Sequence, residues 1–336
     1  MNWIDALLLW YQNSARNLPW RRTRDPYCIW ISEIMLQQTR VEAVRGYYAR
    51  FLEALPDVRS LAQVEDGRLM KLWEGLGYYS RAGNLKRAAQ QVVEREGGAL
   101  PASYEALLAL PGIGAYTAGA IASIAFGVPV PAVDGNVLRV MARKDADYAD
   151  IMDERTRRRV RETLLREMPQ DRPGLFNQAM MELGATVCLP NGAPRCADCP
   201  VAFCCRAHAL GVDRQLPVKK KKTARRIEQK TVFALRSPQG VLGYRRPETG
   251  LLALLYQLPD VPGWLDEGQM MAFLAAHGLH PVGELRVYVR KHIFTHVEWR
   301  MRVCHVQVGN TAPPPGWVFL EEHTHSLPTA YRVCLE

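Results

Sequence analysis

Two acidic residues of this chain lie in segments that could position a carboxyl group for chemistry. Glu33 lies in WISEIMLQQTR (residues 30–40), where a helix would surround its carboxyl group with apolar side chains. Apolar surroundings raise the pKa of a carboxyl group, which suits a general acid. The alternative is a solvated surface glutamate, the usual environment of this residue type. Asp134 lies in VDGNV (residues 133–137), where local sequence alone favours a helix N-cap.

Five of the eight cysteines cluster between residues 188 and 205. Their spacing is Cys188-x7-Cys196-x2-Cys199, followed by x4 to Cys204 or x5 to Cys205. Four thiolates at such spacing suit a tetrahedral zinc ion or an iron–sulfur cluster, and spacing does not choose between them. The remaining three, Cys28, Cys304 and Cys334, are scattered, which disfavours a secreted disulfide scaffold.

A glycine-rich segment, LPGIGAYTA (residues 110–118), predicts a hairpin followed by a helix of small residues. Gly112 and Gly114 would let backbone amides point outward beside the positive end of that helix. Such amides form a cradle for phosphate groups. The alternative is an ordinary glycine-rich turn between two helices.

These segments must be positioned by two domains. The 336 residues suggest two domains at ~150 residues each, and the net charge of +9 favours a polyanionic partner. The first ~215 residues show helical apolar spacing with tight turns between short segments. No apolar run approaches the ~18 residues of a membrane span, and no signal peptide is evident, so we expect a cytoplasmic protein, nucleoid-associated if bacterial.

A basic linker and a second domain are expected after the helical region. Residues 214–230 hold eight basic residues, Lys221 and Lys222 among them, and the single acid Glu228. Like charges at this density resist packing, so this stretch is either a solvated tether or a phosphate contact. Beyond it, residues 231–235 and 241–244 predict a β-hairpin, 286–289 and 299–308 alternate as strands, and 270–276 predicts a helix. We therefore expect a smaller α+β domain.

In their order along the chain, these segments resemble the MutY-type adenine DNA glycosylases of the endonuclease III superfamily. The resemblance covers essentially the whole chain. It rests on LPWR (18–21), DPY (25–27), residues 32–40, GLGYYSR (75–81), the hairpin, VDGNV (133–137) and MELGA (181–185). It implies a mainly α helix-hairpin-helix glycosylase domain over 1–213 with an iron–sulfur loop at 188–205, a linker over 214–228, and a Nudix-like α+β domain over 229–336.

The resemblance implies removal of adenine paired with 8-oxoguanine or guanine, after the adenine is flipped out of duplex DNA. Glu33 corresponds to the acid that protonates adenine at N7. Asp134 corresponds to the carboxylate that stabilises the oxocarbenium-like sugar, with Asn136 and Tyr116 positioning these groups. Because the strand-cleaving relatives carry a lysine where this chain has Tyr116, a monofunctional glycosylase is expected.

Further roles follow from the same resemblance. The family's cysteine loop holds a 4Fe–4S cluster with spacing x6, x2, x5; the first gap here is x7, and the x5 gap selects Cys205 as fourth ligand after Cys188, Cys196 and Cys199. The other expected DNA contacts form four groups. They are the orphan-purine readers Gln38 and Thr39, the wedge Tyr78 with Leu76, the adenine-pocket residues Arg21 and Glu182, and the phosphate-binding Gly112 and Gly114.

The C-terminal segment resembles the Nudix-like module that inspects 8-oxoguanine. Phe294, Thr295 and His296 match the family's Phe-Ser-His loop, with threonine keeping the hydroxyl. The Nudix hydrolase box is missing from the sequence, so no pyrophosphatase activity is expected. The histidines at 292, 296, 323 and 325 are interpreted as surface groups rather than a metal site.

Two other functions are consistent with the sequence. One is an endonuclease III-like pyrimidine glycosylase and lyase, which Tyr116 and the second domain disfavour. The other is a non-catalytic helix-hairpin-helix protein that binds DNA and whose cluster serves structure or redox sensing, which Glu33 and Asp134 disfavour. The family resemblance suggests a monomer on double-stranded DNA.

Overall fold

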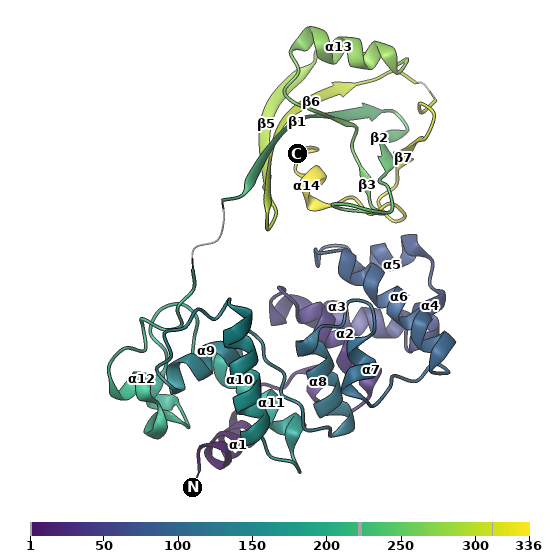
Figure 1. Cartoon of the computed structure of the whole chain (residues 1–336). Helices are drawn as coiled ribbons and strands as arrows, with labels where there is room; N and C mark the ends of the chain where they lie inside the picture. Colours follow the sequence, from purple (N-terminus) through teal and green to yellow (C-terminus); the bar gives the residue numbers. More distant parts are fainter. Residues whose placement is uncertain (1, 221–223, 311) are drawn as a thin grey trace. The chain divides into compact units, whose positions relative to one another are not determined.

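The computed structural model describes residues 2–220, 224–310 and 312–336 (Figure 1). The chain divides into two compact units, one formed by Met1–Gln63 with Asn84–Lys221 and the other by Val64–Gly83 with Lys222–Glu336. Lys221 and Lys222 of the basic stretch lie outside the described residues. The first C-terminal strand begins at Arg226, inside the expected linker. The boundaries at 213/214 and 228/229 stay predictions.

Helices dominate the first unit, as the sequence predicts. Its elements are α1 (Trp3–Ser14), η1 (Pro19–Arg21), α2 (Pro26–Leu36), α3 (Val41–Ala54), α4 (Val58–Gln63), α7 (Tyr104–Leu108), α8 (Ala115–Phe126), α9 (Gly135–Lys144), α10 (Glu154–Glu167), α11 (Pro173–Thr186), η2 (Cys196–Asp198), η3 (Ala202–Cys204) and α12 (Arg206–Ala209). Helix α6 (Ser80–Arg95) enters this unit at Asn84. Among the described residues, no helix has the length and apolar character needed to cross a bilayer.

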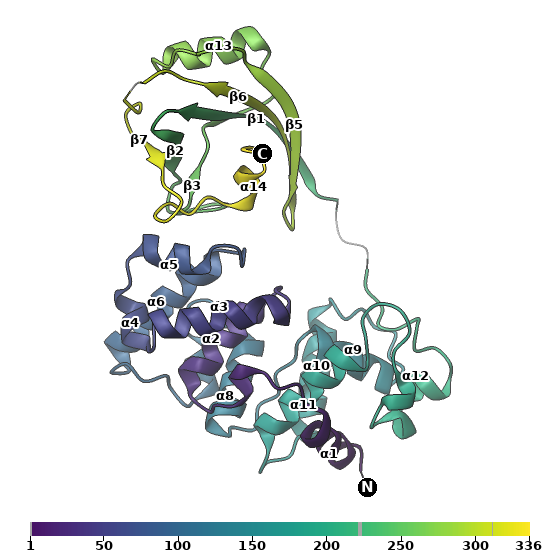
Figure 2. The ribbon, with the colours of Figure 1, turned by 180° about the vertical axis from the view of Figure 1, so that it is seen from behind.

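Helix α8 carries small residues because it packs closely on its neighbours. It lies beside α2 in both ribbon views (Figures 1 and 2). Seven of its residues from Thr117 to Ser123 are buried. A Cβ on Gly119 would lie 2.8 Å from the carbonyl oxygen of Pro131, too close for any side chain. This contact places α8 against the segment that leads to Asp134.

Helices α1, α9 and α11 share one apolar core with the cysteine segment. The core includes Leu7 and Leu8 of α1, Val140 and Met141 of α9, and Phe176, Met180 and Leu183 of α11. Cys188 and Val201 belong to the same cluster. The N-terminus of α9 and the cysteine loop are therefore positioned by one continuous core.

The glycine-rich segment forms the expected turn between α7 and α8. Gly112 has a φ of +76°, and a Cβ there would lie 2.6 Å from the Asn84 Cβ, so only glycine fits. Gly114 is the N-cap of α8, and no atom lies within 4 Å of the place a Cβ would take. The turn thus leaves open space above the start of α8.

Seven strands and two helices form most of the second unit. They are β1 (Arg226–Ser237), β2 (Gly240–Arg245), β3 (Tyr256–Gln257), β4 (Asp260–Pro262), α13 (Glu267–Ala276), β5 (Arg286–Ile293), β6 (Val297–Gln307), β7 (Trp317–Leu320) and α14 (Thr329–Arg332), with α5 (Asp66–Trp73) and the start of α6. The strand order is β3-β2-β1-β6-β5, with β4 on β1 and β7 on β2. The predicted hairpin is confirmed, because Arg236 pairs with Val241 across the β1–β2 turn.

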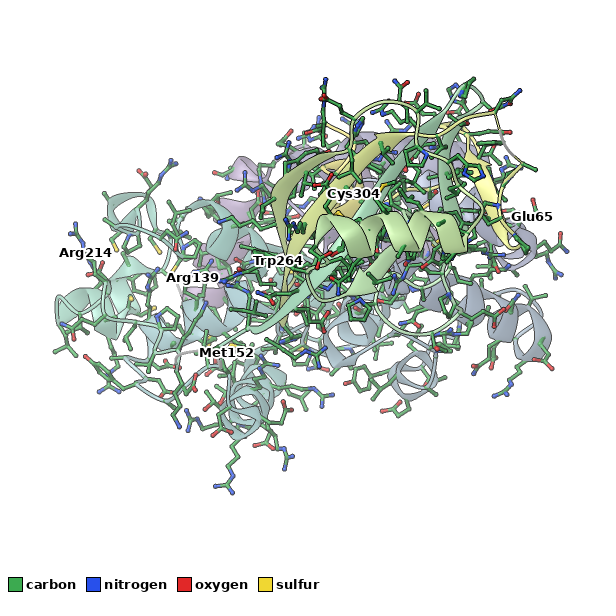
Figure 3. The ribbon with its side chains drawn as sticks, turned by 90° about the horizontal axis from the view of Figure 1, so that it is seen from above. Glu65, Arg139, Met152, Arg214, Trp264 and Cys304 are labelled. Carbon is green, nitrogen blue, oxygen red and sulfur yellow. The ribbon has the colours of Figure 1, made fainter. Side chains whose placement is uncertain are left out.

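The mixed sheet is buried on both faces, which its alternating strand residues explain. Val232 and Ala234 of β1 pack with Tyr331 of α14 on one face. Phe233 and Leu235 pack with α13 on the other face. Cys304 of β6 belongs to this second cluster and lies beside α13 (Figure 3). The predicted α+β fold of the C-terminal region is confirmed.

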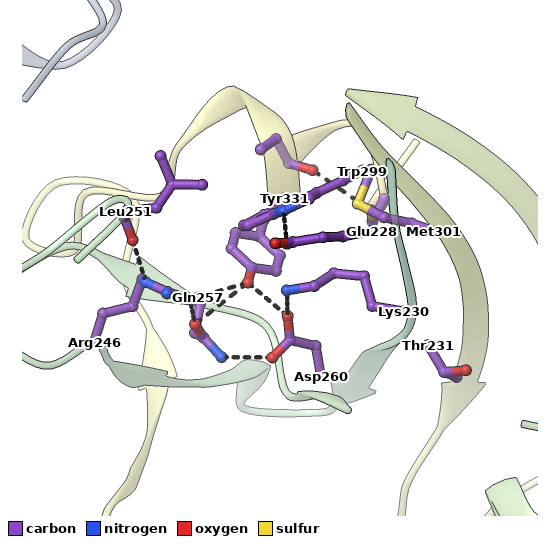
Figure 4. Close-up of polar contacts among 12 residues, drawn as sticks. Glu228, Lys230, Thr231, Arg246, Leu251, Gln257, Asp260, Trp299, Met301 and Tyr331 are labelled. Atoms are coloured by element: carbon purple, nitrogen blue, oxygen red, sulfur yellow. Dashed lines mark hydrogen bonds and ion pairs between the residues drawn. The ribbon is translucent and has the colours of Figure 1, made fainter. Parts of the chain in front are cut away.

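A buried polar network attaches α14 to the sheet (Figure 4). The Tyr331 hydroxyl donates to Asp260 Oδ2 at 2.8 Å, and Gln257 Nε2 donates to Asp260 Oδ1 at 3.1 Å. Lys230 pairs with the same carboxylate and lies 3.8 Å from the Trp299 ring centroid. Both carboxylate oxygens of Asp260 thus have a partner, as burial of a charge requires.

Candidate active site

Helix α2 carries Glu33 into the interior of the first unit. Asp25 caps the helix by accepting from the amides of Tyr27 and Cys28, and Pro26 occupies its first position. Glu33 is only 5% exposed, so the surface alternative is excluded. The Tyr116 hydroxyl of α8 donates to Glu33 Oε2 at 2.5 Å. Burial raises the pKa of Glu33 to about 7, although the hydrogen bond from Tyr116 opposes that rise.

Asp134 is the N-cap of α9, which is the local role that the sequence predicts. Its Oδ1 accepts from the amides of Asn136 at 2.9 Å and Val137 at 2.8 Å, and its Oδ2 accepts from Asn136 Nδ2 at 2.7 Å. Burial raises the pKa of Asp134, and these three donors oppose that rise. Asp134 therefore has three donors that favour its anion, whereas Glu33 has one.

Asn136 is held in place by residues from two helices. Arg139 Nη2 donates to Asn136 Oδ1 at 2.7 Å and to the Gly184 carbonyl at 2.7 Å, and Arg139 Nε donates to the Cys188 carbonyl at 2.7 Å. A Cβ on Gly184 would lie 2.5 Å from the Asn136 Cβ. The glycine therefore allows α11 to approach the start of α9, and Arg139 locks that approach.

One cavity of about 210 Å³ brings the two carboxyl groups together. Seven of the residues singled out in the sequence line it: Arg21, Glu33, Thr39, Tyr116, Asp134, Asn136 and Glu182. Apolar side chains, among them Leu18, Trp20, Ile29 and Ile124, form part of the remaining wall. Gln38, Gly112 and Gly114 of the same unit do not line it. A flat apolar group with a few polar atoms fits such a cavity.

Glu182 is a third carboxylate in the cavity wall, and it is fully buried. Arg16 donates to it from Nε at 2.8 Å and Nη2 at 2.7 Å, and Arg21 Nη2 donates at 2.6 Å. Burial alone would raise the pKa of Glu182, but these hydrogen bonds and the charge of Arg21 lower it to about 2. Glu182 is therefore an anion, in contrast to Glu33.

Sequence reasoning gave no role to four polar or sulfur-bearing residues of this wall: Arg16, Ser32, Gln178 and Met181. Gln178, Met181 and Ala185 stand on one helical face with Glu182, so periodicity around Glu182 could have found them. Gln178 Oε1 accepts from the Tyr11 hydroxyl at 2.6 Å. For Arg16, the only feature of the sequence that could have indicated a role in the cavity is its position just before the LPWR segment.

The comparisons with known proteins match both parts of the chain. Residues 31–167 match the HhH-GPD superfamily of base excision DNA repair proteins, and residues 231–336 match the NUDIX domain. The adenine DNA glycosylase of Homo sapiens is 35% identical over an alignment of 401 residues, gaps included. The alignment covers 97% of this chain and 72% of that protein. The chain belongs to the adenine DNA glycosylase family. The resemblance inferred from the sequence is confirmed.

A second adenine DNA glycosylase agrees with this assignment, and a solved structure supports the fold. The adenine DNA glycosylase of Mus musculus is 35% identical over 385 residues, covering 94% of this chain and 73% of that protein. A solved structure described as a thermostable thymine-DNA glycosylase is 28% identical with a TM-score of 0.57, over 62% of this chain and 95% of that one. This structure supports the helical glycosylase fold of the first unit.

The cysteine loop of this chain, residues 188–205, forms part of the wall of a second cavity. Cys188, Cys196, Cys199 and Cys205 line it, whereas Cys204 does not. Arg143, Lys144 and Arg195 line it too, and Arg143 Nη1 donates to the Cys188 sulfur at 3.2 Å. Four thiols beside three cations suit a negatively charged metal–thiolate group. Among residues 2–220, 224–310 and 312–336, no three or more His, Cys, Asp or Glu side chains are arranged so that they could bind a single metal ion.

The remaining singled-out residues lie in loops. Gln38 is exposed with a φ of +60°, and Tyr78 is 46% exposed with a φ of +50°, both unusual for residues other than glycine. Leu76, in contrast, is buried. In the β5–β6 hairpin, Phe294 packs on Trp299, His296 is exposed, and the Thr295 hydroxyl lies 3.1 Å from the Tyr78 hydroxyl.

Proposed function

We propose that this chain is a monofunctional DNA glycosylase of base excision repair that removes adenine opposite 8-oxoguanine or guanine. The observation that carries the proposal is one cavity lined by Glu33, with its raised pKa, and by Asp134, held by three donors. Membership of the adenine DNA glycosylase family supports the choice of base.

Glu33 is the proposed acid. A pKa of about 7 leaves much of this group protonated at neutral pH, so it has a proton to give to N7 of an adenine in the cavity. Protonation draws electrons from the glycosidic bond and makes adenine a better leaving group. The hydroxyl of Tyr116 holds the carboxyl group in position for this transfer.

Asp134 is the proposed stabiliser of the sugar. As the base departs, positive charge develops on the sugar, and a nearby carboxylate lowers the energy of that cation. The donors from Asn136 and Val137 keep Asp134 at the start of α9 in one orientation. Water then adds to the sugar and leaves an abasic site.

The reaction is proposed to end at the abasic site. Among the residues that the structure describes, no lysine lines the cavity, and Tyr116 presents a hydroxyl there. A Schiff base with the sugar requires an amine, so we expect no strand cleavage by this route.

Double-stranded DNA is the proposed partner, bound by a single copy of the chain. Gly112 and Gly114 are both exposed beside the N-terminus of α8, a suitable contact for a phosphate. We assign recognition of the orphan purine to Gln38 and Thr39, and the wedge to Tyr78 with Leu76. Recognition of 8-oxoguanine falls to Phe294, Thr295 and His296 of the Nudix-like domain, for which we propose no hydrolase activity.

A 4Fe–4S cluster is the proposed resident group of the cysteine loop, held by Cys188, Cys196, Cys199 and Cys205. These four thiols line one cavity with Arg143, Lys144 and Arg195, which fits an anionic cluster. When bound, the cluster would tie the loop to α9 and so stabilise the fold. Loss of the purified protein's near-visible absorbance in Cys205→Ser, with retention in Cys204→Ser, would support this ligand set. Retention in both variants would contradict it.

The decisive experiment uses a duplex with one central adenine–8-oxoguanine pair. Breakage of the adenine strand only after alkali treatment is the expected result. Breakage without alkali at the rate of base release would indicate a lyase, and no release of adenine would leave a non-catalytic DNA-binding protein. Glu33→Gln should abolish base release while DNA binding persists.

A further inference from the structure

We propose that Arg81 is a positioning residue that fixes the backbone of the Tyr78 loop, so that the Tyr78 ring is presented in one orientation for insertion into DNA. The inference deepens the proposed function, on which it rests, and all of the contacts behind it lie within residues 73–81. The loop comprises Gly75, Leu76, Gly77 and Tyr78, between α5 and α6.

Arg81 is buried and binds three consecutive carbonyl groups of this loop. Its Nη2 donates to the Leu76 oxygen at 3.2 Å and to the Gly77 oxygen at 3.0 Å, and its Nε donates to the Tyr78 oxygen at 3.4 Å. The side chain is one of the few charged ones buried among the described residues, at 8% exposure. A planar guanidinium holds its donors in a fixed fork that reaches carbonyls spread along the loop, whereas an ammonium group has three donors on one compact, rotatable nitrogen.

The loop needs such a clamp because its backbone is strained at Tyr78. Gly75 and Gly77 have φ values of +96° and +71°, and Tyr78 has a φ of +50°. A bulky residue in this region is strained, so it persists only where its surroundings impose it. Trp73 Nε1 adds a second donor to the Gly77 oxygen at 3.1 Å.

The clamp leaves the aromatic side chain available. The guanidinium lies 5.3 Å from the Trp73 ring centroid and 5.5 Å from that of Tyr78. Tyr78 nevertheless remains 46% exposed. Its backbone is therefore fixed from inside, while nearly half of its surface stays exposed and its hydroxyl lies 3.1 Å from that of Thr295. An aromatic wedge fills the gap that an extruded base leaves in the stack. It does so best when its loop is already ordered, because ordering a loop on binding costs free energy.

The test compares Arg81→Met, Arg81→Lys, Tyr78→Ala and the double variant Arg81→Met with Tyr78→Ala in the full chain. Arg95→Met is the matched control, an exposed arginine at the end of the same helix. Single-turnover release of adenine opposite 8-oxoguanine is measured for each. In a Glu33→Gln background, which keeps the base attached, a 2-aminopurine beside the target adenine reports unstacking as a rise in fluorescence.

We expect Arg81→Met to slow base release about tenfold or more. In the Glu33→Gln background, the same substitution should abolish the rise in 2-aminopurine fluorescence. Arg95→Met should behave as the unsubstituted protein in both measurements. Because Arg81 acts through Tyr78, the double variant should be no slower than Tyr78→Ala alone. Arg81→Lys, which keeps the charge but not the fork of donors, should fall between. Thermal unfolding shows which variants are folded at the assay temperature, and Arg81→Lys carries the test should Arg81→Met be unfolded.

Unchanged release and fluorescence in the folded Arg81 variants, or losses that multiply with that of Tyr78→Ala, would overturn the assignment. Failure of the unsubstituted protein to release adenine would contradict the proposed function instead. In that case the fluorescence comparison still tests whether Arg81 positions Tyr78, because it requires DNA binding and unstacking but no release of the base.

Discussion

At the scale of single residues, the cavity holds three carboxyl groups whose partners differ. Glu33 has one hydroxyl donor, Asp134 has three neutral donors, and Glu182 has two guanidinium groups. Burial affects all three, so the number and charge of the donors separate them. The result is a carboxyl group with a pKa of about 7 and another with a pKa of about 2 in one cavity. Such divergence is how one site holds an acid beside an anion.

The pH dependence of base release follows from Glu33. Its raised pKa of about 7 means that the acid form dominates below that pH and is lost above it. The single-turnover rate of base release should therefore fall about tenfold per pH unit above pH 7. Protonation of Asp134 at acid pH should lower the rate on the other side. DNA binding measured over the same range separates these effects from affinity, and a rate that is flat or rises from pH 7 to 9 would contradict Glu33 as the acid.

At the scale of elements, the site depends on how closely α11 approaches the start of α9. Gly184 meets Asn136 so tightly that no side chain fits between the helices, and Arg139 bridges the same two elements. Both Asp134 and Asn136 therefore depend on a contact between segments about 50 residues apart in the chain.

Gly184→Ala tests this contact. The added methyl group would overlap the Asn136 Cβ and Cα, so either the helix start moves or the core is strained by about 1–3 kcal/mol. We expect slower base release together with a lower melting temperature. Gly67→Ala in α5 is the control, because no atom lies within 4 Å of its Cβ position. Base release at the unsubstituted rate in Gly184→Ala would show that the site does not need this spacing.

The sequence predicts the local parts of this site better than the contacts between them. The helix around Glu33, the N-cap at Asp134, the hairpin at Gly112 and the β1–β2 turn all follow from short patterns that burial and turn chemistry determine. The carbonyl clamp of Arg81 and the pairing of Arg16 with Glu182 do not. Both depend on three-dimensional packing that brings particular atoms together, which residue type and spacing do not reveal.

At the scale of the whole molecule, two domains are proposed to act on one base pair. The helical domain would hold the extruded adenine, and the Nudix-like domain would inspect its partner base. The net charge of +9 supplies attraction to any duplex, so discrimination has to come from specific contacts. The β5–β6 hairpin offers a hydroxyl at Thr295, next to the hydroxyl of Tyr78.

Thr295→Ala therefore tests whether the second domain contributes to discrimination. Loss of one hydrogen bond should lower the ratio of release rates opposite 8-oxoguanine and opposite guanine by roughly three- to tenfold. Thr295→Ser is the matched control, because it keeps the hydroxyl and should keep the ratio. Single-turnover rates on the two duplexes provide the measurement. Equal slowing on both duplexes would assign Thr295 to general DNA binding, since a contact that reads the partner base must affect one duplex more than the other.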